Sequence, residues 1–92
     1  MIPMLNKSVP ITNRRGLHAR SASVLAKTSS KFKSEIGISS SSAKANGKNI
    51  MSLLLLQASF DSNINIQISG EDEAQAMETI VALIKNKFGE EE

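Results

Sequence analysis

The spacing of hydrophobic residues along the chain predicts four β-strands. Residues 5–12, 35–39 and 63–69 alternate between hydrophobic and polar side chains, most regularly in the last of these segments. A period of two is typical of strands that bury one face. A shorter alternation over residues 43–46 follows a serine-rich turn, which predicts a hairpin. Pro10 cannot donate a backbone hydrogen bond, so it indicates a sheet edge or a bulge in the first strand.

Two further segments have the spacing of amphipathic helices. The first runs from Ala19 to about Lys31, and its apolar face follows the i, i+3, i+4 rule; that face contains Ala22, Leu25, Ala26, Ser29 and Phe32. The second covers residues 50–56, and Asn49 is a good N-cap for it because its side chain can accept a backbone N–H. Periodicity alone leaves a buried strand open for residues 50–56.

A third helix is predicted near the end of the chain. Ser69-Gly70-Glu71-Asp72 resembles a capping box, and the acidic residues favour the first helical turn. The apolar positions then continue to Phe88. We expect Gly89 to end the helix and residues 90–92 to form a frayed acidic tail.

The predicted order of elements is β-α-β-β-α-β-α. Three helices can cover one face of a four-stranded antiparallel sheet, which leaves the other face open. The sequence therefore predicts an α+β open-faced β-sandwich. Ninety-two residues are enough for one such domain, so we expect residues 1–92 to form a single domain.

Composition restricts the chemistry available to the chain. Without a cysteine it has no disulfide and no thiol nucleophile, and one histidine is too little for a transition-metal site; we expect no metal and no cofactor. Residues 1–7 lack the charged start and long apolar stretch of a signal peptide. No apolar run approaches the roughly 20 residues that span a bilayer. We therefore expect a cytoplasmic protein without membrane contacts.

Charge is divided unevenly between the two halves of the chain. Residues 1–48 carry nine lysines and arginines against one acid, a net charge of +8. Residues 49–92 carry two lysines against eight acids, a net charge of −6, so the whole chain has a charge of +2. This asymmetry favours an acidic partner for the N-terminal half. The alternative, that folding interleaves the two sets of charges, stays open.

The strongest candidate for chemistry is Gly16-Leu17-His18-Ala19-Arg20, at the predicted junction of the first strand and helix. An imidazole with an ordinary pKa of ~6.5 is a nucleophile at neutral pH. The first N–H groups of a helix, here those of Ala19 and Arg20, favour an anion. The Arg20 guanidinium can also pair with phosphate oxygens, and Gly16 permits close approach by a partner. His18 is therefore a candidate phosphoryl acceptor.

Several kinds of catalytic site are missing from the sequence. There is no convincing Ser-His-Asp set, no paired carboxylate site and no glycine-rich nucleotide loop. We therefore expect a protein that is acted upon rather than a stand-alone enzyme. The competing interpretation of His18 is an exposed loop or N-cap histidine without chemistry; its place at a strand-to-helix junction favours the acceptor.

These motifs resemble the histidine-containing phosphocarrier (HPr-like) family of the bacterial phosphoenolpyruvate-dependent phosphotransferase system, including its nitrogen-related branch. The resemblance extends over nearly the whole chain. It rests on the motif of residues 16–20, on Gly47-Lys48-Asn49-Ile50-Met51 at the expected distance from it, and on the final helix.

The resemblance implies a mechanism and a set of site residues. Enzyme I would phosphorylate Nδ1 of His18, and the phosphoryl group would pass to a IIA-type partner in sugar uptake or in regulation. The phosphate would be held by Arg20 and the N–H groups that open the helix. Arg15 and Asn13 would lie nearby with weaker roles. A docking patch would consist of Ile50, Met51 and Leu54, for which simple core packing is an equally weighted alternative.

Two positions depart from the family pattern. Family members commonly have a proline after the arginine, where this chain has Ser21. A serine adds an N–H and a hydroxyl, either of which can contact phosphate or cap the helix. Asn49 replaces a serine that a regulatory kinase phosphorylates in many relatives. The asparagine keeps the cap but has no hydroxyl, so it cannot be modified in this way.

Two other functions compete with that of a monomeric phosphocarrier. One is a regulatory module of the same fold, whose protein targets would respond to its phosphorylation state. The other is a small RNA-binding domain, which we disfavour because base stacking needs aromatic side chains. The chain has three phenylalanines and no tyrosine or tryptophan, and each phenylalanine has a plausible core position.

Overall fold

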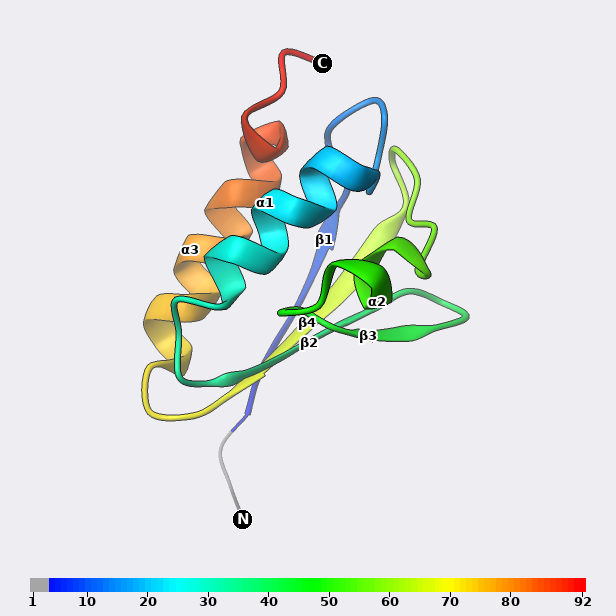
Figure 1. Ribbon diagram of the computed structural model, residues 1–92. Coiled ribbons are helices and arrows are strands. Elements are labelled where there is room, and N and C mark those ends of the chain that lie inside the picture. The colour runs from blue at the N-terminus through cyan, green and yellow to red at the C-terminus, as the bar shows by residue number, and fades with distance from the viewer. Residues whose placement is uncertain (1–3) are drawn as a thin grey trace.

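The fold is seen in a computed structural model that describes residues 4–92. The first three positions of residues 1–7, which lack the features of a signal peptide, lie outside the described residues. Four strands form one sheet in the order β1-β4-β2-β3, and every neighbouring pair is antiparallel. The strands are β1 (Leu5–Pro10), β2 (Glu35–Ser39), β3 (Lys44–Asn46) and β4 (Asn63–Ser69). All four predicted strands are therefore present (Figure 1).

The helices are α1 (Ala19–Ser29), α2 (Ile50–Leu54) and α3 (Glu73–Lys85), followed by the short 3₁₀ turn η1 (Lys87–Gly89). Figure 1 shows α1 and α3 side by side across the sheet, with α2 near β3. This arrangement confirms the α+β fold with an open-faced sheet. Within residues 4–92, no helix has the length and apolar character needed to cross a bilayer.

The core lies between the sheet and the helices. β4 is a central strand, and its three isoleucines at alternate positions, Ile64, Ile66 and Ile68, are at most 1% exposed. They pack with residues from β2, α1 and α3, among them Ile38, Leu25, Ile80 and Ile84. The edge strand β1 matches its predicted pattern less well, because Val9 is its only buried residue.

The end of α3 differs from the prediction. The helix stops at Lys85, and Lys87 and Phe88 have the left-handed φ angles of 58° and 55°. This reversal keeps Phe88 buried in the core, which is why its spacing looked helical in the sequence. After this turn the tail lies against the loop before α1, where the Arg14 N–H donates to the carbonyl of Glu92.

The N-cap of α3 is Asp72, three residues after the serine that begins the expected capping box. Its side chain makes no capping hydrogen bond. Its carboxylate instead accepts bonds from the Ser34 hydroxyl at 2.5 Å, the Lys33 N–H at 2.8 Å and the Ser34 N–H at 2.9 Å. These bonds hold the pKa of Asp72 below its ordinary value. Asp72 thus ties the loop before β2 to the start of α3.

Candidate functional site

The loop that leads into α1 is shaped by Gly16. Its φ angle is +67°, and a Cβ placed on it would lie 2.5 Å from the carbonyl oxygen of Ala58. The neighbouring Leu17 N–H donates to that same oxygen at 2.9 Å. Only glycine fits this left-handed and crowded position without strain. The close approach that Gly16 permits is therefore made by the chain itself, through the loop after α2.

His18 is the N-cap of α1, so the helix begins at Ala19 as the sequence predicted. Its φ and ψ angles are −128° and −176°, which are extended values typical of an N-cap. The Arg20 N–H points at Nδ1 of His18 with an N–N distance of 3.4 Å. The side chain of His18 is 20% exposed. The imidazole thus lies at the positive end of the α1 dipole and is partly open to solvent.

Ser21 completes the cap. Its hydroxyl accepts the His18 N–H at 2.9 Å and donates to the Gly16 carbonyl at 2.9 Å. Together with the bond from the Arg20 N–H to the imidazole, this makes a capping box in which histidine takes the usual place of serine or threonine. Ser21 is fully buried, so its hydroxyl is engaged with the backbone around His18.

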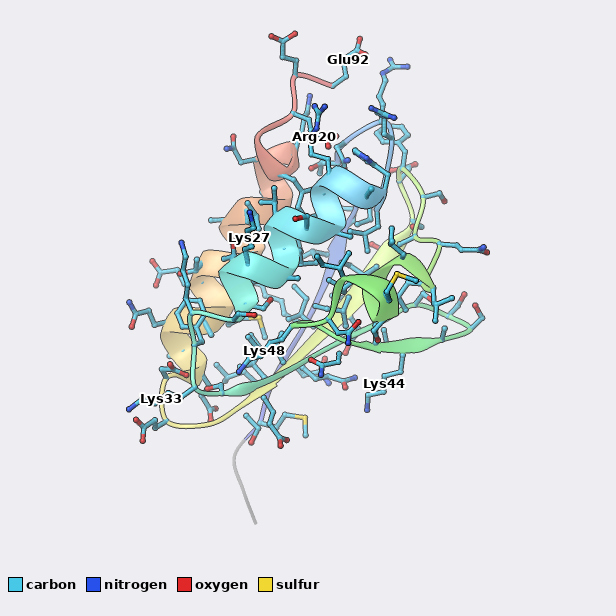
Figure 2. The ribbon with its side chains drawn as sticks, viewed as in Figure 1. Arg20, Lys27, Lys33, Lys44, Lys48 and Glu92 are labelled. Atoms are coloured by element: carbon cyan, nitrogen blue, oxygen red, sulfur yellow. The ribbon has the colours of Figure 1, made fainter. Side chains whose placement is uncertain are left out.

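The arginines predicted to assist lie at the same end of the molecule. Arg15 and Arg20 are both exposed. Figure 2 shows Arg20 at the start of α1, with Glu92 of the C-terminal tail at the same end. A guanidinium at this place can reach an anion bound at the helix N-terminus.

The C-terminal tail meets the site, which the sequence did not predict. Oε2 of Glu90 lies 2.6 Å from Nε2 of His18, and Oε1 accepts a bond from Nδ2 of Asn13 at 2.8 Å. The Arg14 N–H donates to the carbonyl of Glu92. The expectation of a frayed tail is therefore wrong. The only sequence signal was complementary charge, since acidic residues 90–92 and the arginine-rich loop are separated by more than 70 positions.

Glu90 is held in its charged form by this setting. Burial raises the pKa of the Glu90 carboxyl, but hydrogen bonds from Asn13 and His18 outweigh this, helped by the positive charge of Arg15. The net result is a pKa below the ordinary value. Asn13 is itself fully buried and also donates to the Gly16 carbonyl at 2.8 Å. The carboxylate is thus held by a partner that is itself buried and hydrogen-bonded.

An apolar surface lies on α2 and the loop after it. Ile50 and Met51 are 40% and 66% exposed, so core packing does not account for them. Leu54 is only partly exposed and packs against the core. Sequence reasoning missed Leu55 and Phe60, which are 74% and 50% exposed. A helical pattern assigned Leu55 no function, and Phe60 looked like a core residue because it is aromatic.

Known proteins share this fold and motif. The family described as "PTS HPr component phosphorylation site" matches residues 5–86. Phosphocarrier protein HPr of Neisseria meningitidis is 42% identical over 89 residues, which covers 97% of this chain and 100% of that one. Phosphocarrier protein NPr of Shewanella violacea is 37% identical over 86 residues, or 94% of each chain.

Solved structures of HPr proteins have the same fold as this chain. The crystal structure of HPr-C-His from Thermoanaerobacter tengcongensis superposes with a TM-score of 0.90 and 38% sequence identity, covering 96% of this chain and 99% of that one. Fold and sequence together define a phosphocarrier, a component of a relay rather than an enzyme that acts alone. The chain belongs to the HPr family of the phosphotransferase system.

Proposed function

We propose that this protein accepts a phosphoryl group on Nδ1 of His18 from phosphorylated enzyme I and passes it to a IIA-type protein. The observation that carries the proposal is the place of His18 as the N-cap of α1, with its ring partly exposed. A phosphoryl group on Nδ1 would lie on the side of the ring that faces the Arg20 N–H. Helix N-termini favour such anions.

The residues around the ring have separate tasks in this proposal. The N–H groups of Ala19 and Arg20 and the Arg20 guanidinium receive the negative charge that arrives with the phosphoryl group. Ser21 supports the proposal as a cap rather than as a phosphate contact, because its hydroxyl holds the backbone of residues 16–18 in the conformation that presents the ring.

Partner docking is assigned to the exposed apolar surface. Ile50, Met51 and Leu54, together with the charge of Arg15, would contact both enzyme I and the IIA-type acceptor. Leu55 and Phe60 extend that surface. A carrier must leave each partner, so we expect moderate affinities and a monomer that works in the bacterial cytoplasm. Gel filtration with light scattering tests the monomer, and a mass of two chains would exclude it.

The test is labelling with enzyme I and radioactive phosphoenolpyruvate. The wild-type protein should gain one acid-labile, base-stable phosphoryl group, and His18→Ala should gain none. Circular dichroism of the variant serves as the control that its fold is intact. A folded His18→Ala protein that still takes up label would contradict the assignment of the acceptor.

A regulatory role is the second candidate, and a similar solved structure favours it, that of Crh, which is named the catabolite repression HPr of Bacillus subtilis. In that role the phosphorylated and unphosphorylated forms would bind a protein target with different affinities. Asn49 carries no hydroxyl, so His18 would be the position that changes state. Affinity capture with the phosphorylated protein and with His18→Ala would show whether a target distinguishes them.

A further inference from the structure

The contact between the C-terminal tail and the imidazole selects a tautomer of His18. An ionised carboxylate can only accept hydrogen bonds, so at 2.6 Å the Nε2 atom must be the donor to Glu90. On the other side of the ring, Nδ1 faces a backbone N–H and must be the acceptor. Both contacts require the same form of the neutral ring, with its proton on Nε2 and its lone pair on Nδ1.

We propose that Glu90 is a positioning residue for phosphoryl transfer, which fixes the Nε2–H tautomer of His18 and so makes Nδ1 the nucleophile. The inference rests on the proposed function for the chemical step and on geometry for the tautomer. Asn13 contributes to this positioning, because its buried amide donates a hydrogen bond to the second carboxylate oxygen of Glu90 at 2.8 Å. The hydrogen-bonded series Asn13–Glu90–His18 thus orients the ring from its Nε2 side, opposite the reacting Nδ1.

The same contact accounts for the charges during transfer. The Nδ1 lone pair attacks phosphorus, a new N–P bond forms, and the bond between phosphorus and the donor breaks with its electron pair leaving on the donor. The ring keeps its proton on Nε2 and becomes positively charged. The Glu90 carboxylate, already in contact with Nε2, balances this charge, so no proton has to leave the ring as the bond forms.

Nuclear magnetic resonance tests the tautomer without any partner protein. Long-range ¹H–¹⁵N correlations of the imidazole should show the Nε2–H form in the wild-type protein. The spectra are recorded at about pH 8.5, where an ordinary histidine is neutral. In Glu90→Ala the Nδ1–H form should become populated. Glu91→Ala, which removes the same charge from an exposed neighbour, should match the wild type. Glu90→Gln, which retains an acceptor oxygen, should lie between the wild type and Glu90→Ala.

Transfer kinetics with enzyme I give the second measurement. We expect Glu90→Ala to lower kcat by about tenfold, the effect of losing one charge-assisted hydrogen bond at the reacting ring. KM should be nearly unchanged, whereas a docking role would raise it. A wild-type ring protonated on Nδ1, or a Glu90→Ala protein with wild-type tautomer and kcat, would overturn the inference. If enzyme I does not label the wild-type protein, the proposed function fails while the tautomer result stands.

Discussion

The carbonyl oxygen of Ala58 lies where a side chain on residue 16 would have to go. Gly16 therefore connects two loops that are remote in the sequence, one that ends at His18 and one that follows α2. The position of the imidazole depends on this contact, because Leu17, the residue between Gly16 and His18, is bonded to the same oxygen. The backbone conformation of Gly16 thus fixes the loop that leads to His18.

Gly16→Ala should destabilise the protein by about 2 kcal/mol or more, because it adds a left-handed φ penalty to a steric overlap. Urea unfolding of both proteins measures the loss. Gly89→Ala is a matched comparison, since residue 89 also has a positive φ but no atom within 4 Å of the place that a Cβ would take, so its loss should be smaller. Equal losses would show that the Ala58 contact contributes nothing.

Arg20→Ala should leave the fold intact and slow phosphoryl transfer by roughly 10 to 100-fold, since the exposed guanidinium serves the phosphate rather than the core. Arg14→Ala, which removes the same charge from the nearby loop, controls for the lost positive charge. Rates of labelling by enzyme I, measured at several protein concentrations, test this. Unchanged rates would remove Arg20 from the site.

Among the elements, α1 depends most on its first turn. Its capping box joins the imidazole, the Ser21 hydroxyl and the backbone of residues 16–20. The same helix start therefore both stabilises α1 and holds the reactive ring. This dual use gives the buried Ser21 hydroxyl a structural role at the start of the helix.

Ser21→Ala should lower the free energy of unfolding by about 1 kcal/mol, the usual loss for a helix cap. Ser23→Ala, within the same helix but outside the cap, should have a much smaller effect. Thermal unfolding of the two variants makes the comparison. A wild-type melting temperature in Ser21→Ala would mean that the two hydrogen bonds of its hydroxyl are worth nothing.

The elements that were predictable from sequence are those with local causes. The isoleucines of β4 alternate without interruption because both neighbouring strands and the helices pack on that strand, and Asn49 caps α2 as predicted through the Ser52 N–H at 2.9 Å. The residue at which α3 ends and the position of residues 90–92 have non-local causes. The burial of Phe88 turns the chain, and Glu90 finds a partner 72 positions away. Neither leaves a periodic pattern in the sequence.

At the scale of the whole molecule, the two charged halves of the chain meet at the site. The acidic tail lies against the arginine-rich loop, with Glu90 held by Asn13 and His18 and influenced by the charge of Arg15. Elsewhere, Lys33 pairs with Glu71 at 3.2 Å. Charges from the two halves therefore interleave in part.

This arrangement predicts a stability that depends on acid. The pKa of Glu90 is lower in the folded protein than in the unfolded chain, so its stabilisation is complete above the ordinary value of 4.5 and is lost as the pH falls through the folded value. At pH 7 the wild type should exceed Glu90→Gln in unfolding free energy by about 1 to 2 kcal/mol. The difference should shrink as the pH falls below 4.5 and through the lower pKa of the folded protein.

Urea titrations of both proteins across this pH range provide the measurement, with Glu91→Gln as the control that should differ little from the wild type at any pH. A gap between wild type and Glu90→Gln that stays constant down to the lowest pH would show that ionisation of Glu90 has no part in holding the tail.

The buried ring of Phe88 is an anchor that sets how far the last residues can reach. Only Gly89 separates Phe88 from Glu90, so the buried ring limits how far the Glu90 carboxylate can lie from the core. Inserting one residue there would carry the carboxylate on by about 3.3 to 3.6 Å, more than a hydrogen bond can tolerate. The length of this short connection, rather than its composition, thus decides whether the end of the chain can touch the imidazole.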